Sequence, residues 1–312
     1  MVTAVPTDAG TPPLLVLVGP TASGKTGLSL ELAGRFAGEI VSADSRLFYQ
    51  GMDIGTAKPS PAERAAIPHH LIDITRPGQT ITLGEYQQRA YTTIHAIQQR
   101  GRLPILVGGT GQYVKAVVEG WGIPRIPPQP RLRHALAQLG GDEAARWLRL
   151  LDPAGAARID PRNTSRVIRA LEVTLIAGRP ISQLQRKQPP PYRILTIGLT
   201  CDRETLYTRI DQRVEAMMAA GLLDELRQLQ AAGYDRRLPS MSSLGYQQLW
   251  AYLAGELTLA EAVERIKFET HRFARQQYTW FRLDDPTIHW FDITRPGYPS
   301  HIVELVTGWL AT

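Results

Sequence analysis

The chain has 312 residues and a formal net charge of +6 at pH 7, with 35 Lys and Arg against 29 Asp and Glu. Hydrophobic residues make up 43% of it, yet no apolar run is long enough to span a membrane, and the single cysteine excludes an internal disulfide or a cysteine metal cluster. These features favour a cytoplasmic protein of one large or two modest domains, and the positive charge favours an anionic partner such as nucleic acid.

The chain begins with a polar segment, residues 1–13, which has no basic start or apolar core and is therefore expected to be a disordered leader rather than a secretory signal. An apolar run at 14–18 then leads into Gly19-Pro20-Thr21-Ala22-Ser23-Gly24-Lys25-Thr26. This motif, G-x-x-x-x-G-K-[ST], is typical of a phosphate-binding loop between a buried strand and a helix. Its amides and Lys25 would hold a di- or triphosphate, and the Thr26 hydroxyl would hold Mg²⁺. A plain glycine-rich turn would not account for the Lys and Thr.

Strand and helix patterns alternate through the first part of the chain. Strands are expected at 39–43, 70–74 and 103–107, and the capping box Thr82-Leu83-Gly84-Glu85 opens a helix that Gly101 ends. This alternation predicts an α/β fold with a parallel sheet flanked by helices, and ligands then lie at the carboxyl ends of its strands.

The pattern becomes helical between two proline-rich segments, 124–130 and 187–191. We therefore expect a helical insertion domain at 121–191 within a catalytic core made of 14–120 and 192–312. In the second half of this core, a strand is expected at 193–200 and a long helix from Arg203. Another helix should run from the capping box at Thr258 to about Phe281, followed by a strand at 287–293 and a final short helix.

Three segments at strand ends should share one crevice: the phosphate loop, Asp44-Ser45, and Gly108-Gly109-Thr110-Gly111. Asp44 is a candidate general base, although a Mg²⁺ contact or a turn aspartate is also open. The glycine cluster allows close backbone approach to a ligand. Lys58 contacts phosphate or nucleic acid, or is a solvated surface lysine.

Basic residues recur on three predicted helices. Arg162, Arg166 and Arg169 can form a stripe for a phosphodiester backbone, or a solvated face with Glu172 as partner. Arg209 and Arg213 project from one face, where they could clamp a diphosphate or pair with Glu204 or Asp211. In the helix 267–282, cations interleave with aromatic residues, a pattern that suits stacking on unpaired bases.

Together these motifs resemble the tRNA dimethylallyltransferase, or isopentenyl-tRNA transferase, family, whose core is a P-loop NTPase-like sheet. The segments that carry the resemblance are Gly19–Thr26, Ala43–Tyr49, Gly51–Pro59, His69–Asp73, Gly108–Tyr113, Asn163–Glu172, Leu244–Tyr246 and Arg272–Arg282. The resemblance implies transfer of a dimethylallyl group from dimethylallyl diphosphate to N6 of adenosine 37 beside the tRNA anticodon. The products are N6-(dimethylallyl)adenosine and diphosphate. The resemblance further implies a monomer that requires Mg²⁺ and does not bind a membrane.

The resemblance also assigns roles to residues. Catalysis would depend on Asp44, Thr26 and Arg213, with the diphosphate in the loop Gly19–Thr26 and the metal on Thr26. The tRNA would contact Asp44, Ser45, Arg46, Leu47, Thr110, Arg133, Ser165, Arg166, Val167, Ile168, Arg169, Ser242, Gly245, Tyr246, Gln247, Arg272 and Arg275. The target adenine would flip out of its stack toward Asp44, and the insertion would reach over the anticodon loop.

The chain departs from the family pattern at a few positions, and two other functions remain open. Arg46 and Leu47 stand where Met and Gln are common, Ser242 and Ser243 where some members have basic residues or Gln, and His271 where Arg is frequent. A nucleoside or nucleotide kinase with ATP as donor would share the phosphate loop. However, the strand expected at 103–107 is followed by glycines rather than by a second Walker-type aspartate. An RNA-binding NTPase switch would leave Asp44 dispensable.

Overall fold

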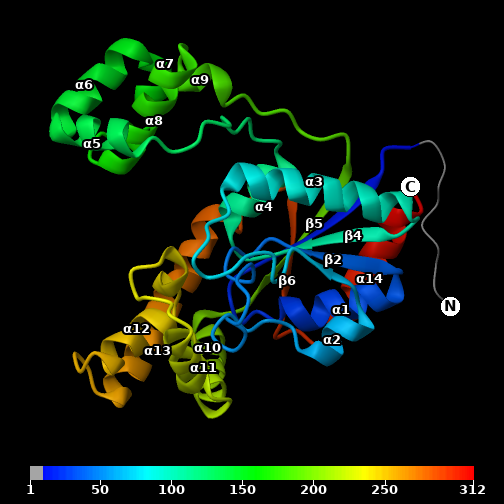
Figure 1. Cartoon of the computed structure of the whole chain (residues 1–312). Coiled ribbons are helices and arrows are strands. Elements are labelled where there is room, and N and C mark those ends of the chain that lie inside the picture. Colours follow the sequence, from blue (N-terminus) through cyan, green and yellow to red (C-terminus); the bar gives the residue numbers. More distant parts are fainter. Residues whose placement is uncertain (1–9) are drawn as a thin grey trace. The chain divides into compact units, whose positions relative to one another are not determined.

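The computed structural model describes residues 10–312, and the chain divides into two compact units (Figure 1). The first unit contains the described residues up to Lys115 together with Pro191–Thr312, and the second contains Ala116–Pro190. The second unit is close in extent to the insertion expected at 121–191. Most of the expected leader, residues 1–9, lies outside the described part of the chain.

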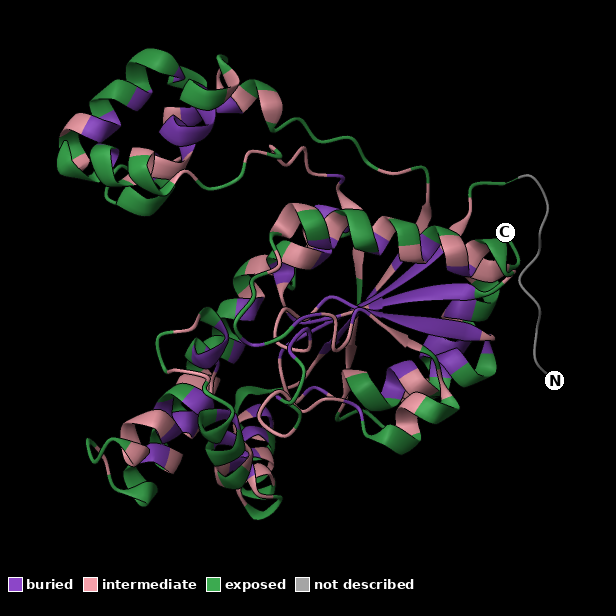
Figure 2. Ribbon diagram, in the orientation of Figure 1, coloured by how far each residue is buried: buried purple, intermediate pink, exposed green. Residues whose placement is uncertain are grey.

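The first unit is built on a six-stranded parallel sheet with the strand order β3-β2-β4-β1-β5-β6. Its strands are β1 (Pro13–Val18), β2 (Gly38–Ser42), β3 (His69–His70), β4 (Leu103–Val107), β5 (Arg193–Thr200) and β6 (Ile288–Asp292). The predicted strands are thus all present, and β1 and β4 are neighbours at the centre. Most residues of both strands are buried, as their purple colour in Figure 2 shows. A strand covered by helices on both faces needs apolar residues throughout, which is why these two sequences are continuously apolar.

The third strand is shorter than its sequence indicates. An extended strand was expected at 70–74, but β3 contains only two residues. Leu71 and Asp73 adopt left-handed conformations, with φ of 61° and 57°, and an extended strand cannot continue through them. The segment after β3 therefore turns back toward Leu47 and Phe48, which accept hydrogen bonds from Asp73 and Thr75.

Helices cover both faces of the sheet. On one face, α1 and α14 pack on β1, β4 and β5 through side chains that include Leu28, Leu32, Ile302 and Val306. On the other face, α3 buries Tyr86, Ala90, Ile94 and Ile97. The helices in this part of the chain are α1 (Lys25–Arg35), α2 (Pro61–Ala66), α3 (Leu83–Gln99), α10 (Arg203–Ala219), α11 (Leu222–Ala231), α12 (Tyr246–Leu253), α13 (Leu259–Trp280) and α14 (Tyr298–Leu310), with a 3₁₀ turn at Pro239–Ser242.

Helices α10 to α13 form a second core of their own, which also takes in Tyr49 and Met52 from the loop after β2. Both predicted capping boxes are present, at Thr82–Glu85 before α3 and at Thr258–Glu261 before α13. Helix α4 (Gly111–Val118) crosses the boundary between the two units. Within residues 10–312, every helix is too short or too polar to cross a membrane.

The second unit is helical, as its sequence indicates, and has its own core. It contains α5 (Pro130–Gln138), α6 (Gly141–Leu151), α7 (Pro153–Ala156), α8 (Thr164–Ala177) and α9 (Ile181–Leu184), packed around residues such as Leu148 and Leu171. Its two ends pair with each other: Gly122 donates to the Arg186 carbonyl at 2.9 Å and Gln188 to the Gly120 carbonyl at 2.7 Å. The chain therefore leaves and re-enters this unit at one place.

Candidate functional site

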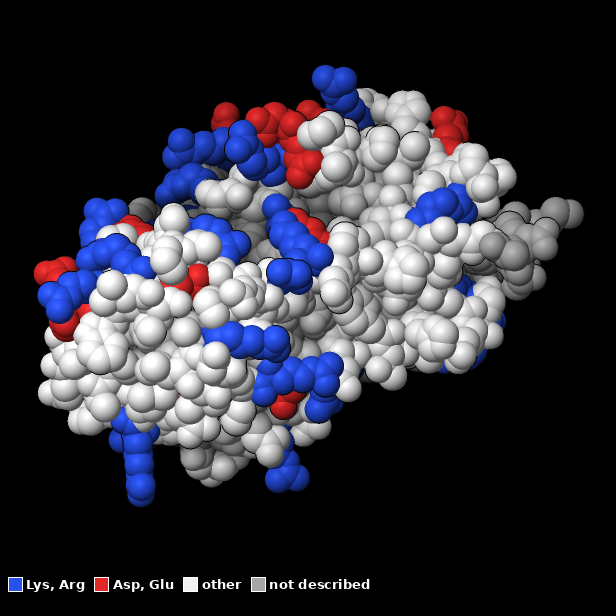
Figure 3. Space-filling view, turned by 90° about the horizontal axis from the view of Figure 1, so that it is seen from above, with Lys and Arg blue, Asp and Glu red and all other residues white. Residues whose placement is uncertain are grey.

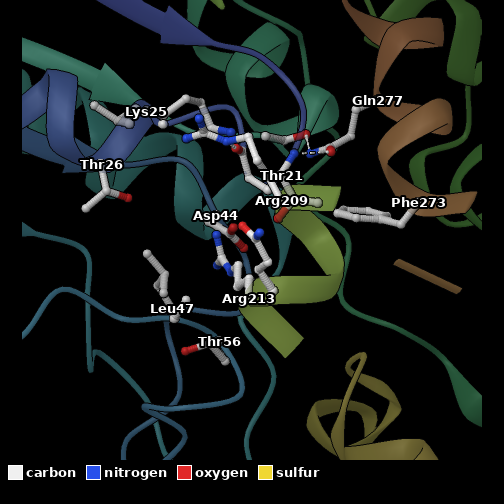
Figure 4. A pocket seen from close by; sticks show the side chains of 17 residues that line it. Thr21, Lys25, Thr26, Asp44, Leu47, Thr56, Arg209, Arg213, Phe273 and Gln277 are labelled. Carbon is white, nitrogen blue, oxygen red and sulfur yellow. Dashed lines mark hydrogen bonds between the residues drawn. The ribbon is translucent and has the colours of Figure 1, made fainter. Parts of the chain in front are cut away.

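A cavity of about 450 Å³ opens at the carboxyl ends of β1, β2 and β4 (Figure 4). It is lined by the phosphate loop, by Asp44 after β2, and by Gly108 and Gly109 after β4. The three segments expected to share one crevice therefore do so. Helices α10 and α13 close the cavity with Arg209, Gln212, Arg213, Phe273 and Gln277.

The phosphate loop has the geometry that its motif predicts. Gly19 has φ +143°, and a Cβ there would lie 2.5 Å from the Leu199 carbonyl oxygen, so only glycine fits. Ala22 (φ 64°) and Gly24 (φ 90°) bend the loop in left-handed conformations before α1 begins at Lys25. Thr21, Ala22, Gly24, Lys25 and Thr26 line the cavity, Ser23 is fully buried, and the backbone of Gly19 and Pro20 lies behind Lys25.

Positive charge converges on this cavity. The Lys25 ammonium donates to the carbonyls of Gly19 (2.9 Å) and Pro20 (2.6 Å), and the Arg209 guanidinium donates to the Ala22 carbonyl (2.9 Å). Loss of hydration and the nearby Arg213 cation lower the pKa of Lys25 to about 7, although Asp44 acts in the opposite direction. Burial also lowers the pKa of Arg213. Three cationic side chains, Lys25, Arg209 and Arg213, therefore line this cavity with a single carboxylate, Asp44, and this excess of positive charge favours an anionic ligand.

Asp44 lies between this cavity and a second one of about 300 Å³. Its Oδ1 accepts the Arg46 N–H at 2.9 Å, which orients the carboxylate. The second cavity is more apolar, with Ile210, Val214 and Met217 of α10 in its wall, and shares Thr21, Asp44, Thr56, Arg213 and Phe273 with the first. An anion in the first cavity and a planar or apolar group in the second would therefore meet beside one carboxylate.

The residues present fit a Mg²⁺ ion that is mostly held by its substrate. The Thr26 hydroxyl and the Asp44 carboxylate line the same cavity. The described part of the chain contains no group of three or more His, Cys, Asp or Glu side chains placed to hold a metal. Mg²⁺ commonly binds through one or two protein oxygens with phosphate and water as its other ligands, which is the arrangement these residues allow.

The glycines after β4 also let other parts of the protein approach closely. Gly108 and Gly109 line the first cavity, so close approach of a ligand to them stays a prediction. A Cβ at Gly108 would lie 2.4 Å from the Ala43 carbonyl oxygen, one at Gly109 would lie 2.2 Å from Gln277 Nε2, and one at Gly111 would lie 2.3 Å from the Trp280 side chain. The glycines are therefore required for β2 and α13 to pack against this loop.

The loop at 51–58 belongs to the site wall, and its lysine is structural. Thr56 lines both cavities and Ala57 lines the first. The buried Lys58 ammonium contacts Asp53 and Asp73 at 2.5 Å each and the Tyr49 carbonyl at 2.8 Å. Neither role considered for Lys58 is therefore correct, since it holds the loop to the segment after β3. Thr56 and Gln277 were not predicted from the sequence, whereas Phe273 is one of the aromatic residues of the helix expected at 267–282.

The residues of the first unit that were expected to touch tRNA fall into three groups. Ser45, Arg46, Thr110, Ser242 and Gly245 line the second cavity, and Leu47 lines the first. Gln247, Arg272 and Arg275 are exposed, and Arg275 donates to the Tyr207 hydroxyl at 2.5 Å. Tyr246 is fully buried, and its hydroxyl donates to Glu225 at 2.6 Å. The expectation that the Tyr246 side chain contacts RNA conflicts with this burial.

In the helical unit, the predicted basic stripe is partly neutralised. The buried Glu172 carboxylate accepts two hydrogen bonds from Arg133, at 2.9 Å each, and one from Arg169 at 2.5 Å, so both arginines are committed to it. Arg162 pairs with Asp160. Ser165 and Arg166 are exposed, Ile168 is half-buried and Val167 is buried in the core of the unit, where its side chain cannot reach RNA.

Ion pairing is common across the protein surface as well. Figure 3 shows blue Lys and Arg side chains on the face in view, with red Asp and Glu side chains beside several of them. Arg236 with Glu256 and Arg282 with Asp284 are two exposed ion pairs of the protein. Several of the exposed cations are therefore already paired with carboxylates.

Comparison with known proteins identifies the family. The IPP transferase family model matches residues 47–284. The chain is 57% identical over 276 residues to a tRNA dimethylallyltransferase of Roseiflexus sp. (strain RS-1), covering 86% of this chain and 90% of that protein. It is 49% identical over 298 residues to one of Thermomicrobium roseum, covering 94% and 90%.

Solved structures agree with this assignment. The crystal structure of a tRNA isopentenylpyrophosphate transferase from Bacillus halodurans is similar with a TM-score of 0.72 at 40% identity, covering 96% of this chain and 97% of that one. A eukaryotic dimethylallyltransferase crystallised while acting on tRNA shares the fold, with a TM-score of 0.83 at 24% identity, covering 94% and 78%. Together with the phosphate loop and the site at the carboxyl ends of the strands, these similarities show that the chain belongs to the IPP transferase family.

Proposed function

We propose that this protein transfers a dimethylallyl group from dimethylallyl diphosphate to N6 of adenosine 37 beside the tRNA anticodon, which yields N6-(dimethylallyl)adenosine and diphosphate. The observation that carries the proposal is the pair of adjoining cavities that share Asp44 and Arg213, one lined by the phosphate loop and the other by apolar side chains of α10. Relatives named tRNA dimethylallyltransferase support the reaction type.

The diphosphate belongs in the first cavity. Backbone N–H groups at the start of α1, the Lys25 ammonium and the guanidinium groups of Arg209 and Arg213 are the donors there. As the C1–O bond of the allylic diphosphate breaks, negative charge grows on the leaving oxygen, and donors fixed before the reaction stabilise it. Mg²⁺ held by the Thr26 hydroxyl, with Asp44 nearby, would add electrostatic stabilisation of the same leaving group.

Asp44 acts as the general base for the acceptor, the N6 amino group of the adenine. The N6 lone pair forms the new N–C1 bond while the diphosphate takes the electron pair of the C1–O bond, and the extra N6 proton passes to the Asp44 carboxylate and then to solvent. The hydrogen bond from the Arg46 N–H keeps this carboxylate in place. The adenine must leave its stack to reach a cavity of this kind, so base flipping is part of the proposal.

The tRNA contacts in the proposal start from the second cavity. Ser45, Arg46, Thr110 and Ser242 line it and can meet the flipped nucleotide. Exposed cations such as Arg166, Arg272 and Arg275 are then available for the phosphate backbone. The Arg46 guanidinium also donates to the Pro239 carbonyl at 3.3 Å. A contact from Arg46 to the base would therefore have to use the remaining N–H groups of this guanidinium. The proposal includes action as a monomer in the cytoplasm, where its tRNA substrate is found.

The test combines product analysis with one substitution. Wild-type protein incubated with tRNA, Mg²⁺ and dimethylallyl diphosphate should yield N6-(dimethylallyl)adenosine at position 37, detected by mass analysis of anticodon-loop nucleosides. Asp44→Asn should lower kcat by about 100-fold or more, because the acceptor loses its base, while tRNA binding persists. Asp224→Asn, an exposed aspartate that pairs with Arg227 on α11, is the matched control.

Two results would contradict the proposal. Near-normal turnover of Asp44→Asn would exclude the base assignment. Phosphoryl transfer from ATP to a nucleoside, in the absence of any prenyl diphosphate, would favour a kinase instead.

A further inference from the structure

Gln277 is a buried polar residue that joins two loops of the site. It lies on α13, in the buried stripe that includes Ile266, Ala274 and Phe281, and its side chain is almost fully enclosed. Its Oε1 accepts the Thr21 N–H at 2.8 Å, and its Nε2 donates to the Gly109 carbonyl at 2.8 Å (Figure 4). Neither the sequence motifs nor the proposed chemistry assigns it a role.

The two loops continue neighbouring strands. Thr21 belongs to the loop after β1 and Gly109 to the segment after β4, and these strands are hydrogen-bonded up to Leu17 and Val107. Beyond that point the chains diverge into their loops. The Gln277 amide offers an acceptor oxygen and an NH₂ donor in one plane, and it uses them here as a peptide group uses its C=O and N–H. The side chain of Gln277 therefore bridges the two loops in the way that a backbone segment between them would. It comes from α13, 256 residues after Thr21 and 168 residues after Gly109.

The fit around this amide is tight. A Cβ at Gly109 would lie 2.2 Å from Gln277 Nε2 and 3.4 Å from the Gly19 carbonyl oxygen. A residue of the same shape without the amide would leave the Thr21 N–H and the Gly109 carbonyl without this partner in a buried place, which is costly. A carboxylate at 277 could still accept from Thr21, but its second oxygen would face the Gly109 carbonyl oxygen.

We propose that Gln277 is a positioning residue that sets the spacing between the phosphate loop and the Gly108–Thr110 segment, and thereby between the leaving diphosphate and the acceptor base. This inference rests on the proposed function. Thr21 and Gly109 line the cavity assigned to the diphosphate, and Thr110 lines the one assigned to the base. A shift of about 1 Å between reacting groups is enough to slow a reaction about 100-fold without weakening binding of either substrate to the same degree.

The experiment compares Gln277→Met with Gln276→Met, a matched change at an exposed neighbour on the same helix. Steady-state kinetics are measured well below the thermal transition of each variant. For Gln277→Met we expect kcat to fall about 10- to 100-fold, KM for dimethylallyl diphosphate to rise only a few-fold, and the Kd for tRNA to stay within about twofold of wild type. Gln276→Met should match wild type in all three.

A second variant approaches the same contact from the other side. Gly109→Ala keeps glutamine at position 277 but puts a methyl group 2.2 Å from the present position of its amide nitrogen. The amide must then move away from the Gly109 carbonyl, so this variant should show the same fall in kcat. Amide hydrogen exchange at residues 19–26 and 108–110 should also become faster in Gln277→Met and stay unchanged in Gln276→Met. This measurement does not require the enzyme to turn over.

The outcomes separate the two proposals. If kcat per folded molecule is unchanged in both Gln277→Met and Gly109→Ala while only the melting temperature falls, Gln277 is merely structural and the inference is overturned. If wild-type protein forms no prenylated tRNA but Gln277→Met alone loosens both loops and weakens inorganic diphosphate binding, the proposed function fails and the bridging role stands.

Discussion

Lys25 shows how a single residue is tuned by the site that surrounds it. Its ammonium donates to two loop carbonyls and lies near the Arg213 guanidinium, and its pKa is lowered to about 7 from an ordinary 10.5. In the ligand-free protein it is therefore mostly charged below pH 7 and mostly neutral above it. A bound diphosphate would favour the charged form, so binding and protonation are coupled.

We therefore predict proton uptake when inorganic diphosphate binds at pH 8. Isothermal titration in buffers with different ionisation enthalpies should show uptake that approaches one proton per site, and affinity should fall by up to about tenfold for each pH unit above 7. Lys25→Arg keeps a permanent cation and should lack this extra proton. Equal proton uptake by the two proteins would show that Lys25 is already charged in the empty cavity.

At the scale of elements, the loop at 51–58 is held by a helix far away in sequence. Glu225 of α11 accepts the backbone N–H groups of Asp53 and Ile54 at 2.8 Å each and of Gly55 at 3.2 Å, together with the Tyr246 hydroxyl at 2.6 Å. A Cβ at Gly55 would lie 2.5 Å from the Tyr246 ring, so the loop packs directly on that ring. Glu225 and Tyr246 thus fix the loop that presents Thr56 to both cavities.

This arrangement predicts a structural role for Tyr246. Tyr246→Phe removes one hydrogen bond to a carboxylate, so the free energy of unfolding should fall by about 1.5–3 kcal/mol, as measured by urea denaturation. The Kd for tRNA should not change, because the ring has no exposed surface. Weaker tRNA binding with unaltered stability would restore the RNA-contacting role that the family resemblance implies.

Features of the site that depend on local sequence patterns could be predicted. Features that depend on contacts between residues far apart in the sequence could not. The phosphate loop, the strand ends and the capping boxes at Thr82 and Thr258 are local patterns, and the structure confirms them. The buried amide of Gln277 had only a weak signal, a polar residue on an apolar helical stripe, and its partners are 168 and 256 residues away. The reason for glycine at 109 could not be found without knowing where α13 packs.

At the scale of the whole molecule, the two units have separate cores, and a buried carboxylate anchors the second. Burial alone would raise the pKa of Glu172, but hydrogen bonds from Arg133, from the Gln129 N–H and from Arg169 lower it to about 2, against an ordinary 4.5. Because the pKa is lower in the folded chain, its contribution to stability is complete above pH 4.5 and is lost as the pH falls toward 2.

Glu172→Gln should therefore destabilise the helical unit and not the sheet unit. We expect a loss of about 3 kcal/mol at pH 7, since one partner of a buried ion pair is removed. The variant should also show a flatter stability profile between pH 4.5 and 2. Hydrogen exchange with mass spectrometry can follow each unit separately, and Asp160→Asn, which breaks the exposed pair with Arg162, should have little effect. Equal destabilisation of both units would mean that they unfold together.

The strand order has a consequence for synthesis on the ribosome. β1 lies between β4 and β5, and β5 is translated only after the whole of Ala116–Pro190. Nascent chains therefore carry β1, an entirely apolar strand from Leu14 to Val18, with one edge open until residue 200 has emerged. The segment made during that interval forms a core of its own. The open edge of β1, and the face of the sheet that α14 covers last, are therefore the apolar surfaces of the sheet unit that wait longest for their partners.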